Sequence, residues 1–219
     1  MKIFLDTANL KEIQAGVDLG VVDGVTTNPT YIAKEGRPTE EQIRAICQIV
    51  DGDISAEVVA TEARKMIAEG RSLARIHANV VVKCPLTRDG IQATKALSSE
   101  NIRVNVTLCF TATQALLAAK AGAYIISPFI GRLDDIAADG LQLIHDIVKI
   151  YGNYGYPTKV LAASVRGPRA VLEVALAGAH ITTMPFKVLD MLFNHPLTDK
   201  GLAAFLADYQ KVFQETAVG

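Results

Sequence analysis

Val80-Val81-Val82-Lys83-Cys84-Pro85 is the stretch of this chain that decides its fold. It is a short apolar run of the β type that ends in a lysine and is stopped by a proline. Such a run between turn signals is typical of a buried strand. Similar short runs recur along the chain, separated by longer stretches with the apolar spacing of helices. The stretch therefore predicts one strand of a repeated strand–helix pattern.

The predicted strands and helices alternate. The strands are expected at Lys2–Leu5, Gly20–Thr26, Asp53–Val59, Asn79–Lys83, Arg103–Leu108, Tyr124–Ser127, Thr158–Ala163 and His180–Met184. The helices are expected at Glu40–Val50, Ala63–Ala78, Gly90–Ser98, Thr111–Ala121, Asp134–Tyr151, Pro168–Ala177 and Pro196–Phe213. Strict alternation of this kind indicates a parallel sheet with helices outside it.

Eight such units predict a single domain over residues 1–219, folded as a (β/α)8 (TIM) barrel with an extra C-terminal helix at about 196–213. A doubly wound open sheet is the alternative. That fold would normally have fewer strands and a glycine-containing ligand loop after the first strand, whereas the first strand here ends in Asp6-Thr7-Ala8-Asn9.

The composition narrows the classes of partner. The net charge is −1 and 21% of residues are charged, so neither a nucleic acid nor an anionic membrane is expected. The apolar runs are too short to span a membrane, and the N-terminus turns acidic too soon for a signal peptide, which favours the cytoplasm. Three cysteines and four scattered histidines show no metal-ligand spacing, so no metal site is expected. Neither a P-loop nor a GxGxxG motif is present.

Polar and charged residues gather where the predicted strands end. In a (β/α)8 barrel the active site lies at the C-terminal ends of the strands. The residues expected there are Asp6, Thr26, Thr27, Asn28, Glu57, Lys83, Asn105, Thr107, Ser127, Phe129, Arg132, Ser164, Arg166 and Met184. A partly desolvated lysine loses some of its proton affinity, and a neutral amine can attack a ketone to form a Schiff base. Lys83 is therefore the candidate nucleophile.

Ordinary structural roles stay open for these residues one by one. Lys83 would be an exposed lysine at a strand end, and Asp6 would cap the helix that follows the first strand. Glu57 would form an ion pair, and Thr26-Thr27-Asn28-Pro29 would be only a turn. All of these roles holding together around one lysine is a much weaker explanation than a shared site.

Several motifs in order along the chain resemble one enzyme family, the transaldolases in their short microbial form. The motifs are Phe4-Leu5-Asp6-Thr7-Ala8, Gly24-Val25-Thr26-Thr27-Asn28-Pro29, Val81-Val82-Lys83-Cys84-Pro85, Asn105-Val106-Thr107-Leu108, Ser127-Pro128-Phe129-Ile130-Gly131-Arg132 and Ala162-Ala163-Ser164-Val165-Arg166. The resemblance implies transfer of a dihydroxyacetone unit, without a cofactor. The donor would be fructose 6-phosphate or sedoheptulose 7-phosphate, and the acceptor glyceraldehyde 3-phosphate or erythrose 4-phosphate.

The resemblance also implies a role for each residue. Lys83 would form the Schiff base, and Asp6 would take the proton from the hydroxyl beside the cleaved bond. Glu57 and Thr107 would hold a catalytic water. The substrate-binding set would be Thr26, Asn28, Asn105, Ser127 and Phe129, with Arg132, Ser164 and Arg166 on the phosphate. Arginine suits phosphate because its planar fork donates two hydrogen bonds at once.

Two other functions remain open on this reasoning. A near relative, fructose-6-phosphate aldolase, releases free dihydroxyacetone, and the resemblance implies Gln and Tyr there at the positions of Glu57 and Phe129. A sugar-phosphate sensor on an inactive barrel is the second. The family also implies a ring-shaped homo-oligomer, a pentamer or decamer, whose last helix reaches a neighbour. The apolar stripe of that helix, which runs from Leu202 to Phe213, fits such a contact and fits packing on its own barrel equally well.

Overall fold

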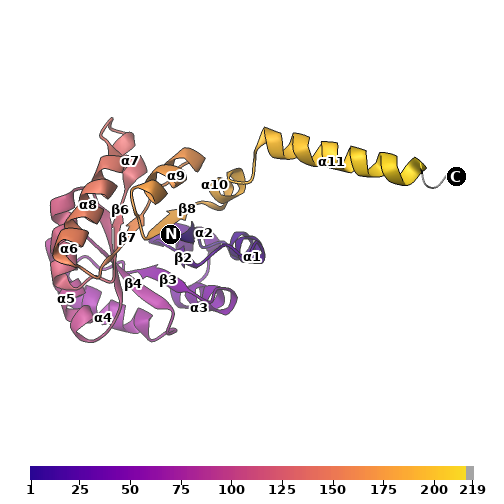
Figure 1. The fold of residues 1–219 in the computed structure, drawn as a ribbon. Coiled ribbons are helices and arrows are strands. Elements are labelled where there is room, and N and C mark those ends of the chain that lie inside the picture. The colour runs from indigo at the N-terminus through magenta and orange to yellow at the C-terminus, as the bar shows by residue number, and fades with distance from the viewer. Residues whose placement is uncertain (216–219) are drawn as a thin grey trace.

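The computed structural model describes the backbone of residues 1–215 and the side chains up to Lys211. Eight parallel strands close into one barrel in sequence order, with β1 also paired to β8, and the helices pack outside (Figure 1). The strands are β1 Lys2–Asp6, β2 Gly24–Thr26, β3 Asp53–Glu57, β4 Val80–Pro85, β5 Val104–Cys109, β6 Ile125–Pro128, β7 Lys159–Ala162 and β8 Ile181–Met184. This closure confirms the predicted (β/α)8 barrel and excludes the open sheet.

The helices follow the strands in order. They are α1 Leu10–Asp18, α2 Pro29–Glu35, α3 Thr39–Ile49, α4 Ala63–Ala74, α5 Arg88–Ser99, α6 Ala112–Ala121, α7 Ile130–Asp134, α8 Gly140–Tyr154, α9 Pro168–Leu176, α10 Phe186–Met191 and α11 Pro196–Glu215. Side-chain caps hold the starts of some of these helices. Thr111 and Gln114 form a reciprocal capping box at α6, and the Asn28 side chain accepts from the Tyr31 N–H at α2.

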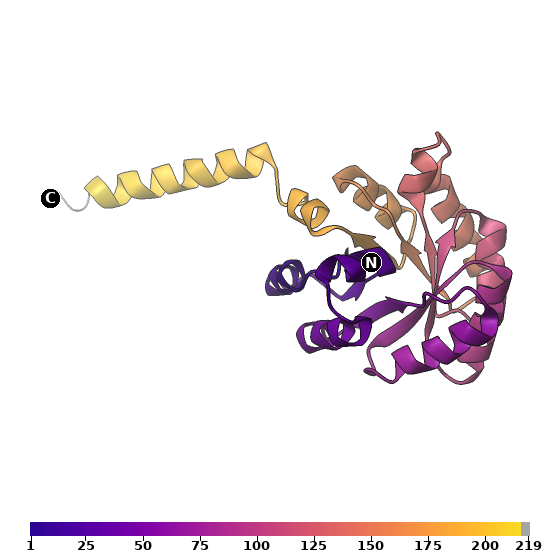
Figure 2. The same cartoon turned by 180° about the vertical axis from the view of Figure 1, so that it is seen from behind.

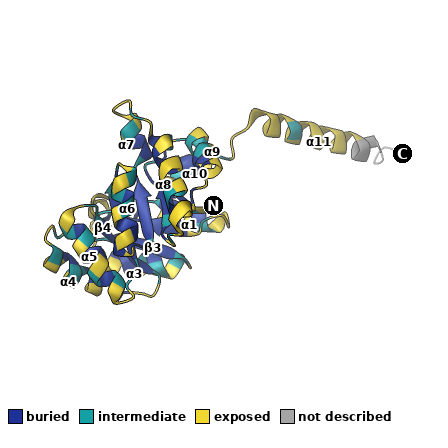
Figure 3. Ribbon diagram, turned by 60° about the vertical axis from the view of Figure 1, so that its left-hand side comes forward, coloured by how far each residue is buried: buried dark blue, intermediate teal, exposed yellow. Residues whose placement is uncertain are grey.

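The apolar core has two parts, one on each side of the sheet. The larger part lies between the strands and the helices. Figure 3 shows buried residues, in dark blue, on the strands and on the helices around them. The smaller part consists of Phe4, Ile125, Leu161, Ala163 and Ile181. Phe4 is two residues before Asp6, so both side chains project from the same face of β1. The small cluster is thus an apolar floor beneath the polar strand ends.

Several predicted boundaries were wrong, and local chemistry explains them. The strand predicted at Gly20–Thr26 begins only at Gly24, because Gly20 has φ +71° and ends the turn after α1. The helix predicted at Asp134–Tyr151 is observed as α8, which begins only at Gly140, where the Asp139 side chain caps it. Asp134 is instead the last residue of α7, and Ala137, with φ +57°, lies in the turn between the two helices. No range was predicted for α1, α2 or α10. At α2 the segment Thr26-Thr27-Asn28-Pro29 also fits a turn, which hides the start of the helix.

Helix α11 stands away from the barrel. Both views show it extending outward from α10 with no other element beside it (Figures 1 and 2). Its apolar residues Leu202, Phe205, Leu206 and Tyr209 are all more than half exposed. Packing on its own barrel, one of the two alternatives, is therefore not observed for these side chains. Phe213, the last residue of the predicted stripe, lies outside the described side chains. Within the described residues, no helix has the length and apolar character needed to cross a membrane.

Candidate active site

Two adjoining cavities open at the C-terminal ends of the strands. One, of about 150 Å³, contains Asp6 and is called the Asp6 cavity. The other, of about 430 Å³, contains Glu57 and is called the Glu57 cavity. Five residues line both cavities: Asn28, Tyr31, Lys83, Phe129 and Arg132. The Lys83 amine thus lines both cavities. It lies two residues before the end of β4, which runs on to Pro85 instead of ending at Lys83 as predicted.

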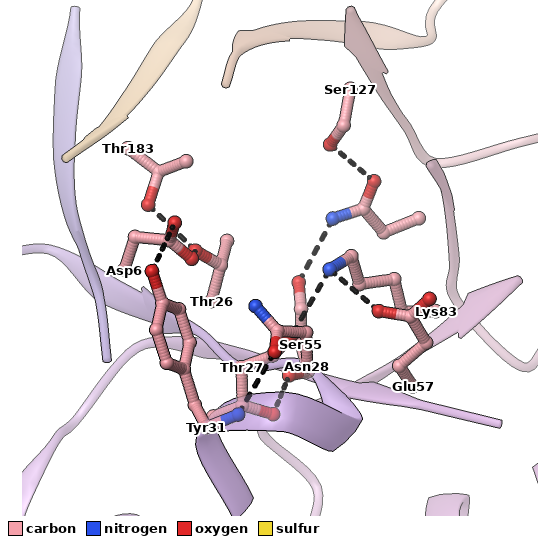
Figure 4. A network of polar contacts seen from close by, with 11 residues as sticks. Asp6, Thr26, Thr27, Asn28, Tyr31, Ser55, Glu57, Lys83, Ser127 and Thr183 are labelled. Atoms are coloured by element: carbon pink, nitrogen blue, oxygen red, sulfur yellow. Dashed lines mark hydrogen bonds and ion pairs between the residues drawn. The ribbon is translucent and has the colours of Figure 1, made fainter. Parts of the chain in front are cut away.

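The Lys83 amine is almost completely buried but lies among oxygen atoms. Its Nζ is 2.8 Å from Glu57 Oε2 and donates to the Thr27 carbonyl oxygen at 3.0 Å (Figure 4). The side chain is 5% exposed. Glu57 and Lys83 are register partners on β3 and β4, which sets their side chains on the same face of the sheet. The ordinary role considered for Lys83, an exposed lysine at a strand end, is therefore wrong.

Asp6, at the end of β1, is held from two sides. The Thr26 hydroxyl donates to Asp6 Oδ1 at 2.8 Å, and the Tyr31 hydroxyl lies 3.5 Å from Oδ2. Burial raises the pKa of the Asp6 carboxyl, while Lys83, Thr26 and Tyr31 partly offset this effect. Asp6 does not cap α1, because Asn9 does. A carboxylate with a raised pKa is a better proton acceptor near neutral pH.

A buried polar layer supports the lysine from below. Ser127 donates to Asn105 Oδ1 at 2.7 Å, and Asn105 Nδ2 donates to Ser55 at 3.0 Å. Asn105 is completely buried and lines neither cavity, whereas Ser127 reaches the Asp6 cavity. The layer therefore fixes Ser127 at the edge of the site. Asn105 contributes by holding Ser127 and Ser55 through its hydrogen bonds.

The end of β5 is irregular and aims a hydroxyl at the site. The register with β6 shifts between Val106 and Cys109, and Leu108 has φ +59°, a conformation that costs a leucine roughly 1–3 kcal/mol. Thr107 and Leu108 both line the Glu57 cavity. Among the described residues, the buried Thr107 hydroxyl has no hydrogen-bond partner. A buried polar group without a partner indicates a place for water or ligand.

Two arginines lie at the rim of the cavities, and they differ in the groups that they contact. Arg132 faces both cavities, with its guanidinium 4.9 Å from the centre of the Phe129 ring. No carboxylate partner is found for it among the described side chains. Arg166 lines neither cavity, because its Nη2 donates to Asp135 Oδ2 at 2.6 Å. That ion pair lowers the pKa of the Asp135 carboxyl.

Gly131 brings the Arg166 side of the rim close to the site. A Cβ at Gly131 would lie 2.8 Å from Arg166 Nε and 3.0 Å from Ser164 Oγ, so only glycine lets these groups approach. Ser164 has φ +63° and lines the Asp6 cavity. Arg132 and Ser164 therefore line the Asp6 cavity, whereas Arg166 lies close to Ser164 without lining it.

Other nucleophiles near the site are poorly suited to reaction. Burial raises the pKa of the thiols of Cys84 and Cys109 to about 12, so both are protonated near neutral pH. No group of three or more His, Cys, Asp or Glu in the described part of the chain could hold a metal ion.

Most of the predicted set meets at the two cavities. Asp6, Thr26, Asn28, Lys83, Ser127, Phe129, Arg132 and Ser164 line the first, and Glu57 and Thr107 line the second. Among the lining residues that were missed, Tyr31 and Thr183 contact the Asp6 and Thr26 side chains. The hydroxyls of Thr183 and Thr26 form a hydrogen bond of 2.7 Å. Thr183 directly precedes Met184, the residue expected at the end of the last strand, so its position in that strand could have been inferred from the sequence. Tyr31 was missed because helix α2 was missed.

The chain is similar to known proteins along almost its whole length. A sequence model of the family "Transaldolase/Fructose-6-phosphate aldolase" matches residues 3–217. A "Probable transaldolase" of Desulfatibacillum aliphaticivorans is 61% identical over 96% of this chain and 99% of its own length. The proteins of that name from Kosmotoga olearia and Moorella thermoacetica are 57% and 58% identical, and the first alignment spans both chains completely. With a family match over nearly all of its length and full-length relatives at this identity, the chain belongs to the transaldolase/fructose-6-phosphate aldolase family.

Proposed function

We propose that the protein is a transaldolase that works through a Schiff base on Lys83. It would transfer a dihydroxyacetone unit from sedoheptulose 7-phosphate or fructose 6-phosphate to glyceraldehyde 3-phosphate or erythrose 4-phosphate, as in the pentose phosphate pathway. The observation that carries the proposal is the buried Lys83 amine, which lies between a carboxylate 2.8 Å away and two open cavities. The names of the full-length relatives support transfer as the reaction.

Imine formation is assigned to the Glu57 side. The amine adds to the C2 ketone, the carbinolamine loses water, and a positioned acid and base must move protons in both steps. Glu57 is close enough to Lys83 to exchange a proton with it directly. The unpartnered Thr107 hydroxyl, which lines the same cavity, supplies a site for the water that is released and later returns.

Cleavage of the C3–C4 bond is assigned to the Asp6 side. Asp6 removes the proton from the C4 hydroxyl, the bond electrons move into the imine, and an aldose phosphate leaves. The three-carbon enamine stays on Lys83 until an acceptor aldehyde arrives and the same steps run in reverse. Thr26 holds one Asp6 oxygen and leaves the carboxylate facing the cavity. Asn28 and Ser127, which line the same cavity, would bind hydroxyls of the three-carbon unit, and the hydrogen bond from Ser127 to Asn105 would orient Ser127.

The phosphate is assigned to the rim. Arg132 and Ser164 reach the Asp6 cavity, and Arg166 would join them if its bond to Asp135 were exchanged for the phosphate. Phosphate held at this distance supplies binding energy remote from the reacting carbons, which orients them for cleavage.

Fructose-6-phosphate aldolase activity is the second candidate, because the family includes both reactions. Phe129 favours transfer. It lines both cavities and presents a ring without a hydroxyl to the space near Lys83. No proton donor is therefore added there to protonate the enamine and release free dihydroxyacetone. An assay of released dihydroxyacetone against transferred product, with and without acceptor, separates the two reactions.

We further propose that the chain is one functional domain that assembles as a homo-oligomer, a pentamer or decamer, in the cytoplasm. Support for assembly comes from α11, whose apolar side chains Leu202, Phe205 and Leu206 are exposed far from the barrel. Light scattering of the full chain, and of a Phe205→Glu variant, measures the state directly. A monomer in both samples would contradict assembly.

The central experiment is chemical trapping of the imine. Fructose 6-phosphate and borohydride should inactivate the protein and add a reduced three-carbon unit to Lys83. Peptide mapping locates the label, and Lys95, an exposed lysine on α5, serves as the internal control. Label on another lysine would disprove the assignment, and no label would favour a sensor over an enzyme.

A further inference from the structure

Tyr31 enters the active site from helix α2, two residues after the Gly24–Pro29 motif ends. It is the third residue of α2, and the Asn28 side chain accepts its backbone N–H at 3.0 Å. This cap fixes the first turn of the helix just after the end of β2. The half-buried Tyr31 side chain then lines both the Asp6 cavity and the Glu57 cavity.

The Tyr31 hydroxyl points toward the carboxylate assigned as the base. Its oxygen is 3.5 Å from Asp6 Oδ2, while Thr26 holds Oδ1 at 2.8 Å, so the two donors lie on different oxygens of one carboxylate (Figure 4). A separation of 3.5 Å is long for a hydrogen bond between oxygens, and catalytic hydrogen bonds in free enzymes often tighten only with substrate bound. The amine of Lys34 lies 5.6 Å from the ring centre and holds the outer face of the ring.

We propose that Tyr31 is a positioning residue for the aldol step: its hydroxyl orients Asp6 Oδ2 and favours the ionised carboxylate that removes the C4 hydroxyl proton. This inference rests on the proposed function and deepens it by assigning the second hydrogen-bond donor of the base. Imine formation, which takes place on the Glu57 side of Lys83, does not require it.

The charges around the pair fix the direction of the effect. Burial raises the pKa of Asp6, and the Tyr31 hydrogen bond acts against it, so removal of the hydroxyl raises that pKa further. Burial and the Asp6 charge in turn raise the pKa of Tyr31, which keeps its hydroxyl protonated as a donor. The other charged groups that face the pair are Lys83 on β4, Glu57 on β3, Glu12 on α1, Lys34 on α2 and Arg132 on α7. All of them are present in every variant of the test.

The test compares Tyr31→Phe with Tyr154→Phe, an exposed tyrosine on α8 that is remote from both cavities. Loss of one hydrogen bond lowers kcat for transfer by about 2- to 10-fold and moves the acid limb of its pH profile upward by roughly half a pH unit. Tyr154→Phe leaves both unchanged. Tyr31→Leu shows the same pH shift as Tyr31→Phe, because both variants lack the hydroxyl.

A second readout separates the aldol step from the imine step. Free dihydroxyacetone forms an imine on Lys83 with loss of water, and borohydride reduces that imine to a stable secondary amine without any C–C cleavage. We expect Tyr31→Phe to be labelled at the rate of the unmodified protein. An unchanged pH profile, equal losses in labelling and transfer, or an effect only in Tyr31→Leu would overturn the inference. Absence of label on the unmodified protein would overturn the proposed function itself, and this inference with it.

Discussion

The two ends of the barrel carry similar polar and charged residues, but those at the N-terminal end are paired with one another and those at the C-terminal end are not all paired. At the N-terminal end, Asp53 forms an ion pair with Arg103 through Oδ1. Its Oδ2 accepts a hydrogen bond of 3.0 Å from the Tyr124 hydroxyl. Lys159 donates to the same hydroxyl at 2.6 Å, and Arg103 and Lys159 lie 5.2 Å and 4.4 Å from the Tyr124 ring centre. Each charge in this cluster has a partner in the protein.

At the C-terminal end, comparable groups are left incomplete. Within the part of the chain that the structure describes, the buried Thr107 hydroxyl has no partner, and Arg132 faces an aromatic ring instead of a carboxylate. Asp6 has a raised pKa because burial outweighs its hydrogen bonds. The comparison teaches that a satisfied network stabilises the fold, whereas an unsatisfied one at a cavity is available to a substrate.

Removing the amine at the incomplete end should have the largest effect on activity. Lys83→Met should lower transfer by ~10³-fold or more, because the nucleophile is lost. Circular dichroism should show the same secondary structure, with a lower unfolding midpoint, since the buried Glu57 carboxylate loses its partner. Lys95→Met is the matched control. Normal transfer by Lys83→Met would disprove the Schiff-base assignment.

Asp6→Asn tests whether the incomplete end costs stability. Transfer should fall by about 10²- to 10⁴-fold with loss of the base. The folded pKa of Asp6 is raised, so its ionisation favours the unfolded state increasingly as pH rises through the unfolded and then the folded pKa. The neutral variant should thus have a higher unfolding midpoint than the unmodified protein at pH 8, with a smaller difference at pH 4. A lower midpoint at pH 8 would contradict this reasoning.

Arg103→Met applies the same logic at the satisfied end and should have the opposite outcome. The mostly buried Asp53 carboxylate would keep only the Tyr124 hydroxyl, at a cost of about 3 kcal/mol in the free energy of unfolding. Urea titration measures this loss. Transfer by the folded variant should be unchanged, because the cluster is at the far end of the strands. A large fall in kcat without loss of stability would show that the two ends are coupled.

The sequence allowed the barrel to be predicted because its signals are local and repeated. Buried strands such as Val80–Pro85 are short apolar runs, and the parallel register then places Glu57 opposite Lys83. The same logic located most of the residues that line the cavities. The polar layer under Lys83 escaped prediction, since the bond from Asn105 to Ser55 joins residues 50 positions apart.

Residues whose role depends on exact backbone direction could not be predicted. Tyr31 faces Asp6 only because Asn28 caps α2, and Arg166 is turned toward Asp135 by a loop with Ser164 at positive φ. The motif that contains Arg132 and the motif that contains Arg166 looked equivalent as phosphate ligands. The structure distinguishes them by a partner, because Asp135 pairs with Arg166 and not with Arg132.

The two arginines provide the mildest test of the comparison. Arg132 lines the cavity and has no carboxylate partner among the side chains that the structure describes. Arg132→Ala should therefore lower kcat/KM for phosphorylated substrates by roughly 10- to 150-fold, the equivalent of one charge-assisted hydrogen bond. Arg166→Ala should cost less, because Arg166 must first leave Asp135 to reach a phosphate. Unphosphorylated fructose should be nearly insensitive to both changes. If Arg166→Ala instead has the larger effect, Asp135 holds Arg166 ready for the phosphate, and a satisfied ion pair would then be part of the binding site. Equal losses for fructose and its 6-phosphate in Arg132→Ala would show that Arg132 only packs on Phe129.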